Sequence, residues 1–251
     1  MRPAAAAPTP ARTWMLAALD LVFPAVCPVC TRALGAGRRD PLCGPCWSAI
    51  VPLTPPWCVR CGLPFPAFAG TGLADTGLCP PCATDPPRFA WARAAALYEG
   101  ALRDALHAFK FRGKRALAHP LAALLGETLA DHLPQDVDAL VPVPLAVARE
   151  RDRGFNQAAL LAERLAIEID VPSRPGWLRR TRGTAPQTEL TAAERRANVH
   201  GAFAAGSDVR GRSVALVDDV LTTGATASAC AGALLDAGAR RVGVVTVARV
   251  G

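Results

Sequence analysis

Eight of the nine cysteines fall into four Cys-x-x-Cys pairs, a spacing typical of metal binding. Two pairs separated by 12 residues form a first quartet, and two pairs separated by 17 residues form a second. Because Zn²⁺ prefers four thiolates in a tetrahedron, each quartet predicts one structural zinc ion with no open position for water. The expected ligands are Cys27, Cys30, Cys43 and Cys46 for one ion, and Cys58, Cys61, Cys79 and Cys82 for the other.

Alternatives to sequential zinc binding stay open at this point. The spacing also allows interleaved pairing, in which the first pair joins the third and the second joins the fourth. Redox-active dithiols or reduced structural thiols would show the same spacing. The ninth cysteine, Cys230, lies on an apolar helical stripe and is expected in the core.

A second run that could do chemistry is Val-Ala-Leu-Val-Asp-Asp-Val-Leu-Thr-Thr-Gly-Ala-Thr, residues 214–226. It predicts a buried strand over 213–217 and a helix over 223–237. Ligands of open α/β sheets bind at the carboxyl ends of strands, where this turn lies. Free backbone N–H groups and the helix dipole favour an anion there, and Gly224 lets the backbone approach a phosphate. The residues expected to hold the phosphate are Thr222, Thr223, Gly224, Ala225 and Thr226.

The acidic pair Asp218–Asp219 stands at the end of the same predicted strand. Carboxylates would repel a phosphate at close range, so they are expected to accept hydrogen bonds from sugar hydroxyls or to meet a divalent cation. Phosphate on one side and a diol or metal on the other describe a ribose 5-phosphate with an activated anomeric carbon. The alternative is a helix merely capped by Thr222 or Thr223, with the two acids at the sheet edge.

These residues must be positioned by elements that the hydrophobic pattern predicts. Composition shifts near residue 87, which divides the chain into a disordered leader with a short helix (1–23), a double zinc ribbon (24–87) and a third part (88–251) of alternating strands and helices. The alternation predicts an α/β fold, a parallel sheet with flanking helices. Strands are expected over 94–98, 138–143, 213–217 and 242–248, helices over 102–109, 116–132, 156–167 and 223–237, and an irregular polar stretch over 174–186.

The formal charge of +7 at first suggests an acidic partner such as nucleic acid. Eight zinc-bound thiolates would add eight negative charges and two Zn²⁺ would return four positive ones, which lowers +7 to +3. The remaining indication is local: a basic run interleaved with phenylalanines suits single-stranded nucleic acid, or equally a helix end with two core phenylalanines. The run comprises Phe109, Lys110, Phe111, Arg112, Lys114 and Arg115.

The Leu-Val-Asp-Asp-Val-Leu-Thr-Thr-Gly-Ala-Thr run resembles the signature of type I phosphoribosyltransferases, and the whole chain resembles the ComF family. The resemblance covers nearly the whole chain from Cys27 to the C-terminus. The matching features are the double zinc ribbon, Lys110-Phe111, Pro142-Val-Pro-Leu145, Arg153-Gly-Phe-Asn-Gln157, and the series Arg182, Gln187, Leu190, Arg195, Asn198 and Phe203. The family is associated with natural competence and with handling of imported single-stranded DNA.

The resemblance implies a type I phosphoribosyltransferase-like fold that binds phosphoribosyl pyrophosphate with Mg²⁺. It implies that Asp218 and Asp219 face the ribose as catalytic residues and that residues 222–226 hold the 5-phosphate. The loop 144–153 would bind pyrophosphate through arginines, with Arg149 and Arg153 as the leading candidates beside Arg151. The stretch 179–198 would be a flexible loop that closes over the site.

One departure from the purine-type enzymes concerns catalysis. Thr222 occupies the position where those enzymes usually place an acidic general base, and no carboxylate lies between Asp219 and Asp236. The leading prediction is therefore a phosphoribosyltransferase-like protein acting in competence and DNA uptake, with unknown acceptor. The alternative is a non-catalytic module that handles single-stranded DNA or binds a competence-machinery protein and keeps a relic or sensory nucleotide site.

Location in the cell follows from the cysteines and the N-terminal residues. The apolar stretch 14–26 is interrupted by Asp20 and Pro24, and no apolar run reaches the length of a membrane span. We therefore expect a cytoplasmic protein without a membrane span, because thiols stay reduced and available for zinc in the cytosol.

Overall fold

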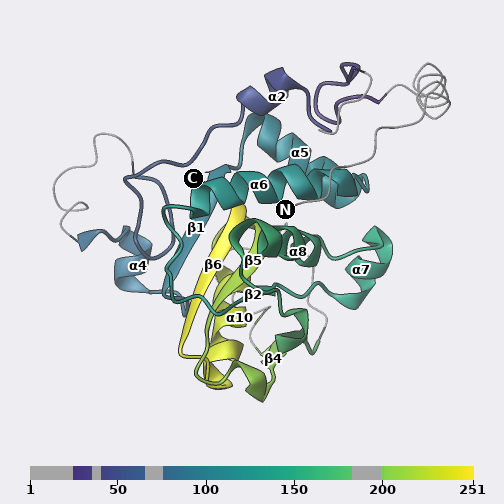
Figure 1. Ribbon diagram of the computed structural model, residues 1–251. Helices are drawn as coiled ribbons and strands as arrows, with labels where there is room; N and C mark the ends of the chain where they lie inside the picture. The colour runs from purple at the N-terminus through teal and green to yellow at the C-terminus, as the bar shows by residue number, and fades with distance from the viewer. Residues whose placement is uncertain (1–24, 36–40, 66–75, 183–198, 200) are drawn as a thin grey trace, which may run out of the picture.

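The fold is seen in a computed structural model that describes residues 25–35, 41–65, 76–182, 199 and 201–251 (Figure 1). The predicted leader 1–23 lies outside the described residues. So do positions 183–198 of the predicted flexible loop, which include Gln187, Leu190, Arg195 and Asn198.

Four parallel strands form the central sheet, in the order β1-β6-β5-β2. Their bounds are β1 (Trp91–Leu97), β2 (Ala139–Pro142), β5 (Ser213–Leu221) and β6 (Arg241–Arg249). Apolar side chains fill both faces of β5 and β6, as expected for parallel strands covered on both sides. At Gly243 of β6 a Cβ atom would overlap the indole ring of Trp91 on β1, so only glycine fits beneath that ring.

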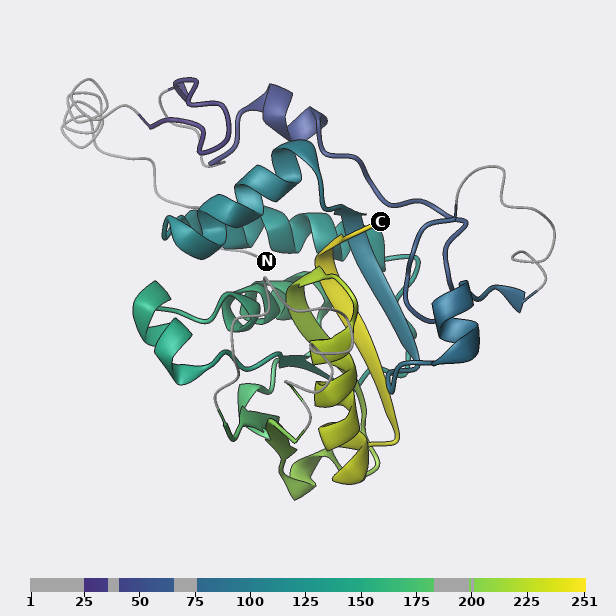
Figure 2. The same cartoon turned by 180° about the vertical axis from the view of Figure 1, so that it is seen from behind.

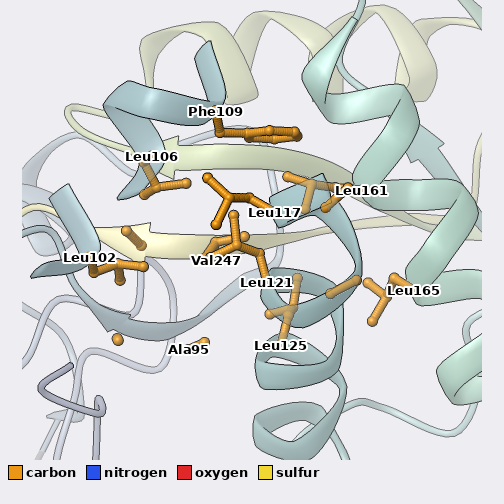
Figure 3. Close-up of a cluster of buried hydrophobic side chains, with 14 of the residues drawn as sticks. Ala95, Leu102, Leu106, Phe109, Leu117, Leu121, Leu125, Leu161, Leu165 and Val247 are labelled. Atoms are coloured by element: carbon orange, nitrogen blue, oxygen red, sulfur yellow. The ribbon is translucent and has the colours of Figure 1, made fainter. Parts of the chain in front are cut away.

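Helices cover both faces of the sheet and confirm the predicted α/β class (Figures 1 and 2). One face carries α5 (Gly100–Phe111), α6 (Ala118–Leu129) and α8 (Gln157–Ile169), and the other carries α10 (Ala225–Asp236). Figure 3 shows the core beneath the first three helices, where leucines of α5, α6 and α8 meet Val247 of β6 and Ala95 of β1. Within the described residues, no helix combines the length and apolar character needed to cross a membrane.

The cysteine-rich segment straddles one edge of the sheet. Its first part, with the short helix α2 (Gly44–Ser48), joins the core under α5 and α6, whereas its second part, with α4 (Pro80–Thr84), joins the core on the α10 face. The connection between them pairs with the outer edge of β1: the Leu53 N–H donates to the Ala95 carbonyl (2.9 Å) and the Leu97 N–H to the Val51 carbonyl (3.0 Å). The two parts therefore pack against opposite faces of the sheet at the edge formed by β1.

The bounds of most predicted elements lie within three residues of those in the structure, and three predicted elements differ more. Strand β5 continues past residue 217 to Leu221, because β6 is equally long and pairs with it as far as Leu221↔Arg249. Residues 147–153 of the predicted pyrophosphate loop form a helix, α7 (Val147–Arg153), which ends at Gly154. The predicted irregular stretch contains a 3₁₀ turn (Pro175–Trp177) and β3 (Leu178–Arg180), which pairs antiparallel with β4 (Phe203–Ala205). Two further 3₁₀ turns cover Arg115–Leu117 and Ser207–Val209.

Candidate functional site

A cavity of about 640 Å³ opens at the carboxyl ends of β2 and β5. Its walls come from α5, from α7 and the residues that precede it, from the second half of β5, and from the turn into α10. The non-cysteine residues proposed for the site from sequence line this cavity, except Arg151, which is exposed outside it. Those that line it are Asp218, Asp219, Thr222, Thr223, Gly224, Ala225, Thr226, Arg149 and Arg153.

The turn into α10 has the backbone form of an anion cradle. Gly224 precedes the helix with φ of 77°, a left-handed conformation that favours glycine, and a Cβ there would lie 3.5 Å from the Phe89 ring. The Thr223 hydroxyl accepts a weak hydrogen bond from the Ala225 N–H (3.4 Å). α10 is 12 residues long, so its dipole favours a phosphate at this end.

Asp219 is held by a partner that the sequence did not assign to this site. Lys110, near the end of α5, places its Nζ 2.8 Å from Asp219 Oδ2, and the side chains are only 19% and 5% exposed. The sequence placed Lys110 in a nucleic-acid run, because nothing in the local pattern shows which strand end α5 faces. Lys110 is therefore a cavity residue that sequence reasoning missed, although the resemblance had already marked Lys110-Phe111 as a matching segment.

Asp218 is the less constrained member of the acidic pair. Its Oδ1 accepts a hydrogen bond from the Asp219 N–H (2.9 Å), and the side chain keeps partial contact with the cavity. Burial and the neighbouring Asp219 charge raise the pKa of Asp218 to about 8. Burial lowers the pKa of Lys110, but attraction to Asp219 outweighs it and the net shift is upward. The site thus holds one firm ion pair beside one carboxyl that titrates near neutrality.

The opposite wall of the cavity is cationic. Arg149 and Arg153 lie one turn apart on α7, which therefore presents both to the cavity from a helix, not from the loop that the sequence predicted. The Arg153 guanidinium stacks on the Phe111 ring at 4.9 Å, and its buried Nη1 has no hydrogen-bond partner among the described residues. Burial lowers the pKa of Arg153. Such an unsatisfied, desolvated donor is suited to a phosphate oxygen.

The basic run of α5 does not form one continuous surface. Lys110 points to Asp219, the Arg112 Nη2 donates to the Pro28 carbonyl (3.0 Å), and the Arg115 Nη2 donates to the Gly154 carbonyl. Phe109 is fully buried, whereas Phe111 is 59% exposed at the cavity. Most of these cations therefore have structural partners within the protein.

Both cysteine quartets form compact clusters, and the sequential pairing is confirmed. Within each quartet all four sulfur atoms lie within 4.8 Å of one another. The Cys30 and Cys43 sulfurs are 3.5 Å apart, and those of Cys61 and Cys79 are 3.6 Å apart. Four sulfurs at about 2.3 Å from a tetrahedral Zn²⁺ would be separated by about 3.8 Å, so both clusters fit zinc. Cys230 lies apart from them, on α10, and is fully buried.

Backbone groups help to hold the thiolates. Burial raises the pKa of Cys27, but N–H groups of Cys43, Cys30 and Val29 outweigh it and lower the pKa to about 6. Cys58 in the second quartet behaves alike, and its pKa falls to about 7. Burial and the neighbouring sulfurs raise the pKa of Cys46, Cys79 and Cys82, so the N–H groups stabilise one thiolate in each quartet.

Comparisons with known proteins agree with both halves of the chain. The double zinc ribbon domain model matches residues 18–83, and the phosphoribosyl transferase domain model matches residues 122–251. The DNA utilization protein YhgH of Escherichia coli is 32% identical over 91% of this chain and 99% of that protein.

Two further relatives come from other bacteria. Competence protein F of Haemophilus influenzae is 30% identical over 84% of this chain and 91% of its own length. Competence protein ComFC of Bacillus subtilis is 30% identical over 79% of this chain and 80% of its own length. With the two domains matched in this order and relatives aligned over most of both lengths, the chain belongs to the ComF family.

Proposed function

We propose that this protein binds phosphoribosyl pyrophosphate together with Mg²⁺ in the cavity at the carboxyl ends of β2 and β5. The observation that carries the proposal is that acidic, basic and phosphate-binding groups lie on different walls of one cavity. A phosphate cradle at α10, a carboxyl pair on β5 and arginines on α7 all line the same space. A ligand with a phosphate, a diol and a metal-bound pyrophosphate matches that order.

In this proposal each wall of the cavity binds a different part of the ligand. Residues 222–226 bind the 5-phosphate through backbone N–H groups and threonine hydroxyls. Asp218 accepts hydrogen bonds from the ribose hydroxyls, while Asp219 is oriented by Lys110 and supplies negative charge beside it. Arg149 and Arg153 bind the pyrophosphate, whose Mg²⁺ arrives with the substrate and offsets its charge.

Turnover, if it occurs, would be displacement of pyrophosphate at the anomeric carbon. The bond from that carbon to the pyrophosphate oxygen breaks with its electron pair leaving on oxygen, and a bond to the acceptor nucleophile forms. Arg149 and Arg153 would stabilise charge on the leaving group. Thr222 cannot act as the acidic base of purine-type enzymes, so the acceptor must lose its proton to another group or bind as an anion.

We further propose that the protein acts in the cytoplasm on DNA taken up by the cell. Relatives named for DNA utilization and competence support the part of this proposal that concerns DNA. A second candidate function is a non-catalytic module for single-stranded DNA or a competence-machinery partner, with the nucleotide site as sensor or relic. It is favoured by the exposed Phe111 ring with Arg153 stacked on it, an arrangement that could stack a base.

Titration calorimetry with Mg²⁺ and phosphoribosyl pyrophosphate tests binding, and pyrophosphate release tests turnover against a panel of acceptors that includes DNA. Saturable one-to-one binding is the expected result, and its absence would reject the proposal. Binding without pyrophosphate release, combined with strongly salt-dependent binding of single-stranded oligonucleotides, would favour the second function.

Binding of the Mg²⁺ complex is expected to depend on pH through Asp218. With a pKa of about 8 this carboxyl is mostly protonated at pH 6, so it must lose its proton before both its oxygens can accept hydrogen bonds from the ribose hydroxyls. The dissociation constant should fall about tenfold per pH unit as the pH approaches 8 and then level off. Calorimetry at pH 7 in buffers of different ionisation enthalpy should detect proton release.

Asp218→Asn provides the comparison, because it removes this group and leaves titration of the ligand's phosphates in place. Parallel pH profiles for the two proteins would contradict the role of Asp218.

The raised pKa of Asp218 also affects the stability of the fold, which falls with rising pH whereas ligand affinity rises. Since the folded state keeps a proton that the unfolded chain loses near pH 4, this group's contribution to the free energy of unfolding is lost as the pH rises from about 4 through about 8.

A further inference from the structure

Arg249, near the end of β6, joins the second cysteine quartet to the candidate phosphate-binding turn. Its residue exposure is only 8%. The guanidinium Nη1 donates to the carbonyls of Leu221 (3.1 Å) and Thr222 (2.7 Å), where β5 ends and the turn begins. On the other side Nε donates to the Cys61 carbonyl (3.2 Å), and Nη2 lies 4.0 Å from the Cys61 sulfur.

The charge of this arginine is balanced in an unusual way. No carboxylate of the described residues lies within ion-pair distance of Arg249; its acceptors are carbonyl groups, including that of Val250 (2.6 Å), and the Cys61 sulfur. A buried cation is costly unless it is paired. Four thiolates around Zn²⁺ carry a net charge of −2, which makes the second quartet the counter-charge for Arg249.

Among the residues that the structure describes, none connects the first quartet to the turn in this way. This quartet packs in the core under α5 and α6, and Arg112 donates a hydrogen bond to the Pro28 carbonyl there, on the α5 side of the sheet. The second quartet also approaches the turn through packing, because Arg60 donates to the Phe89 carbonyl (3.0 Å) and the Phe89 ring lies against Gly224. The two metal centres are therefore inequivalent with respect to the cavity.

We propose that Arg249 is a positioning residue that couples the second cysteine centre to the phosphate-binding turn. It fixes the Leu221 and Thr222 carbonyls and so sets the backbone from which the turn departs, while the thiolates of the second centre stabilise its charge. The statement that the turn binds phosphoribosyl pyrophosphate rests on the proposed function, but the coupling itself does not. Because coupling between two sites is reciprocal, a ligand that orders the turn also raises the zinc affinity of the second centre, and we expect this as slower zinc loss.

The first test follows hydrogen exchange of the backbone amides in residues 221–226 of the zinc-loaded full chain. Arg249→Met should raise their exchange rate about tenfold, because hydrogen bonds from a charged donor are lost. Arg241→Met is the matched control: it changes an arginine at the other end of β6 whose Nη1 faces Asp136 at 3.4 Å. Equal exchange in wild type and Arg249→Met would overturn the proposal.

A second test follows zinc release after addition of a thiol-modifying reagent and a chromogenic chelator. In Arg249→Met one of the two zinc ions should leave about tenfold faster and the other at the wild-type rate. Acceleration of both ions, or of neither, would overturn the coupling. Should Arg249→Met fail to fold, Arg249→Lys serves instead. It keeps the charge but cannot span both segments, so faster exchange at 221–226 is again expected and unchanged exchange contradicts the proposal.

Binding measurements separate the coupling from the proposed function. If wild type binds Mg²⁺–phosphoribosyl pyrophosphate, Arg249→Met should weaken that binding about tenfold, and the ligand should slow release of one zinc ion only. Unaltered affinity in the variant would reject the coupling while leaving the function intact. If wild type binds no ligand, the proposed function fails, and the exchange and zinc-release results still decide the coupling.

Discussion

Exchange of both acids for amides, Asp218→Asn with Asp219→Asn, is expected to abolish binding of phosphoribosyl pyrophosphate and Mg²⁺ while two zinc ions stay bound. The variant removes all the negative charge that the described cavity residues offer to a sugar or cation. Loss of two charge-assisted interactions corresponds to roughly a hundredfold or greater loss of affinity. Calorimetry gives the affinity, and metal analysis shows whether the cysteine centres are intact.

The double variant also removes the partner of Lys110, so its stability must be measured beside its affinity. Leaving that ammonium unpaired is expected to cost about 3 kcal/mol of unfolding free energy, the low end of the range for buried pairs because Lys110 is partly exposed. Asp236→Asn is the matched control, since Asp236 is exposed and forms an ion pair with the exposed Arg88. Unchanged affinity in the double variant would reject the site assignment.

Removal of both zinc ions by a chelator under reducing conditions is expected to unfold the cysteine-rich segment and expose both faces of the sheet edge. The cysteines belong to the two hydrophobic cores, and the linker 51–53 pairs with β1. Loss of packing and of hydrogen bonds therefore extends into the sheet. Structural zinc contributes on the order of 10 kcal/mol in small zinc domains. Calorimetric unfolding should therefore show a midpoint lowered by more than about 10 °C.

Metal analysis supplies the companion measurement, with about two zinc ions per chain in the native protein and none after chelation. Cys230→Ala is the control, because this thiol is buried outside both quartets and its loss should leave zinc content unchanged. A chain that keeps its unfolding midpoint after complete zinc removal would contradict the structural role of both centres.

Local patterns in the sequence were sufficient to predict most of the sheet and the two cysteine clusters. Apolar runs placed all four strands of the central sheet, and the Cys-x-x-Cys spacing favoured the sequential quartets that the structure contains. The turn proposed to bind phosphate could be predicted because its left-handed backbone conformation favours glycine, and the sequence has Gly224 at that position.

What the sequence did not reveal depends on contacts between distant segments. The acids at 218 and 219 suggested a strand end, but β6 continues beside them and extends β5 to Leu221. Lys110 lies 109 positions before Asp219, so no local pattern could assign it to the cavity. The cations of 144–153 alternate with acids and resemble a solvated loop, and only the packed structure shows a helix with two arginines at the cavity.

The hydrogen bonds of the two cysteine centres have a consequence for the order of assembly during translation. The first centre is tied to Arg112, which follows Pro28 by 84 positions, and these segments leave the ribosome early. The second is tied to Arg249, which follows Cys61 by 188 positions. Because synthesis proceeds from the N-terminus, the second centre lacks its contacts with Arg249 until β6 has left the ribosome. Until then its thiols are exposed to solvent. Nascent chains halted before β6 should therefore protect the thiols of one quartet and leave the other open to alkylation.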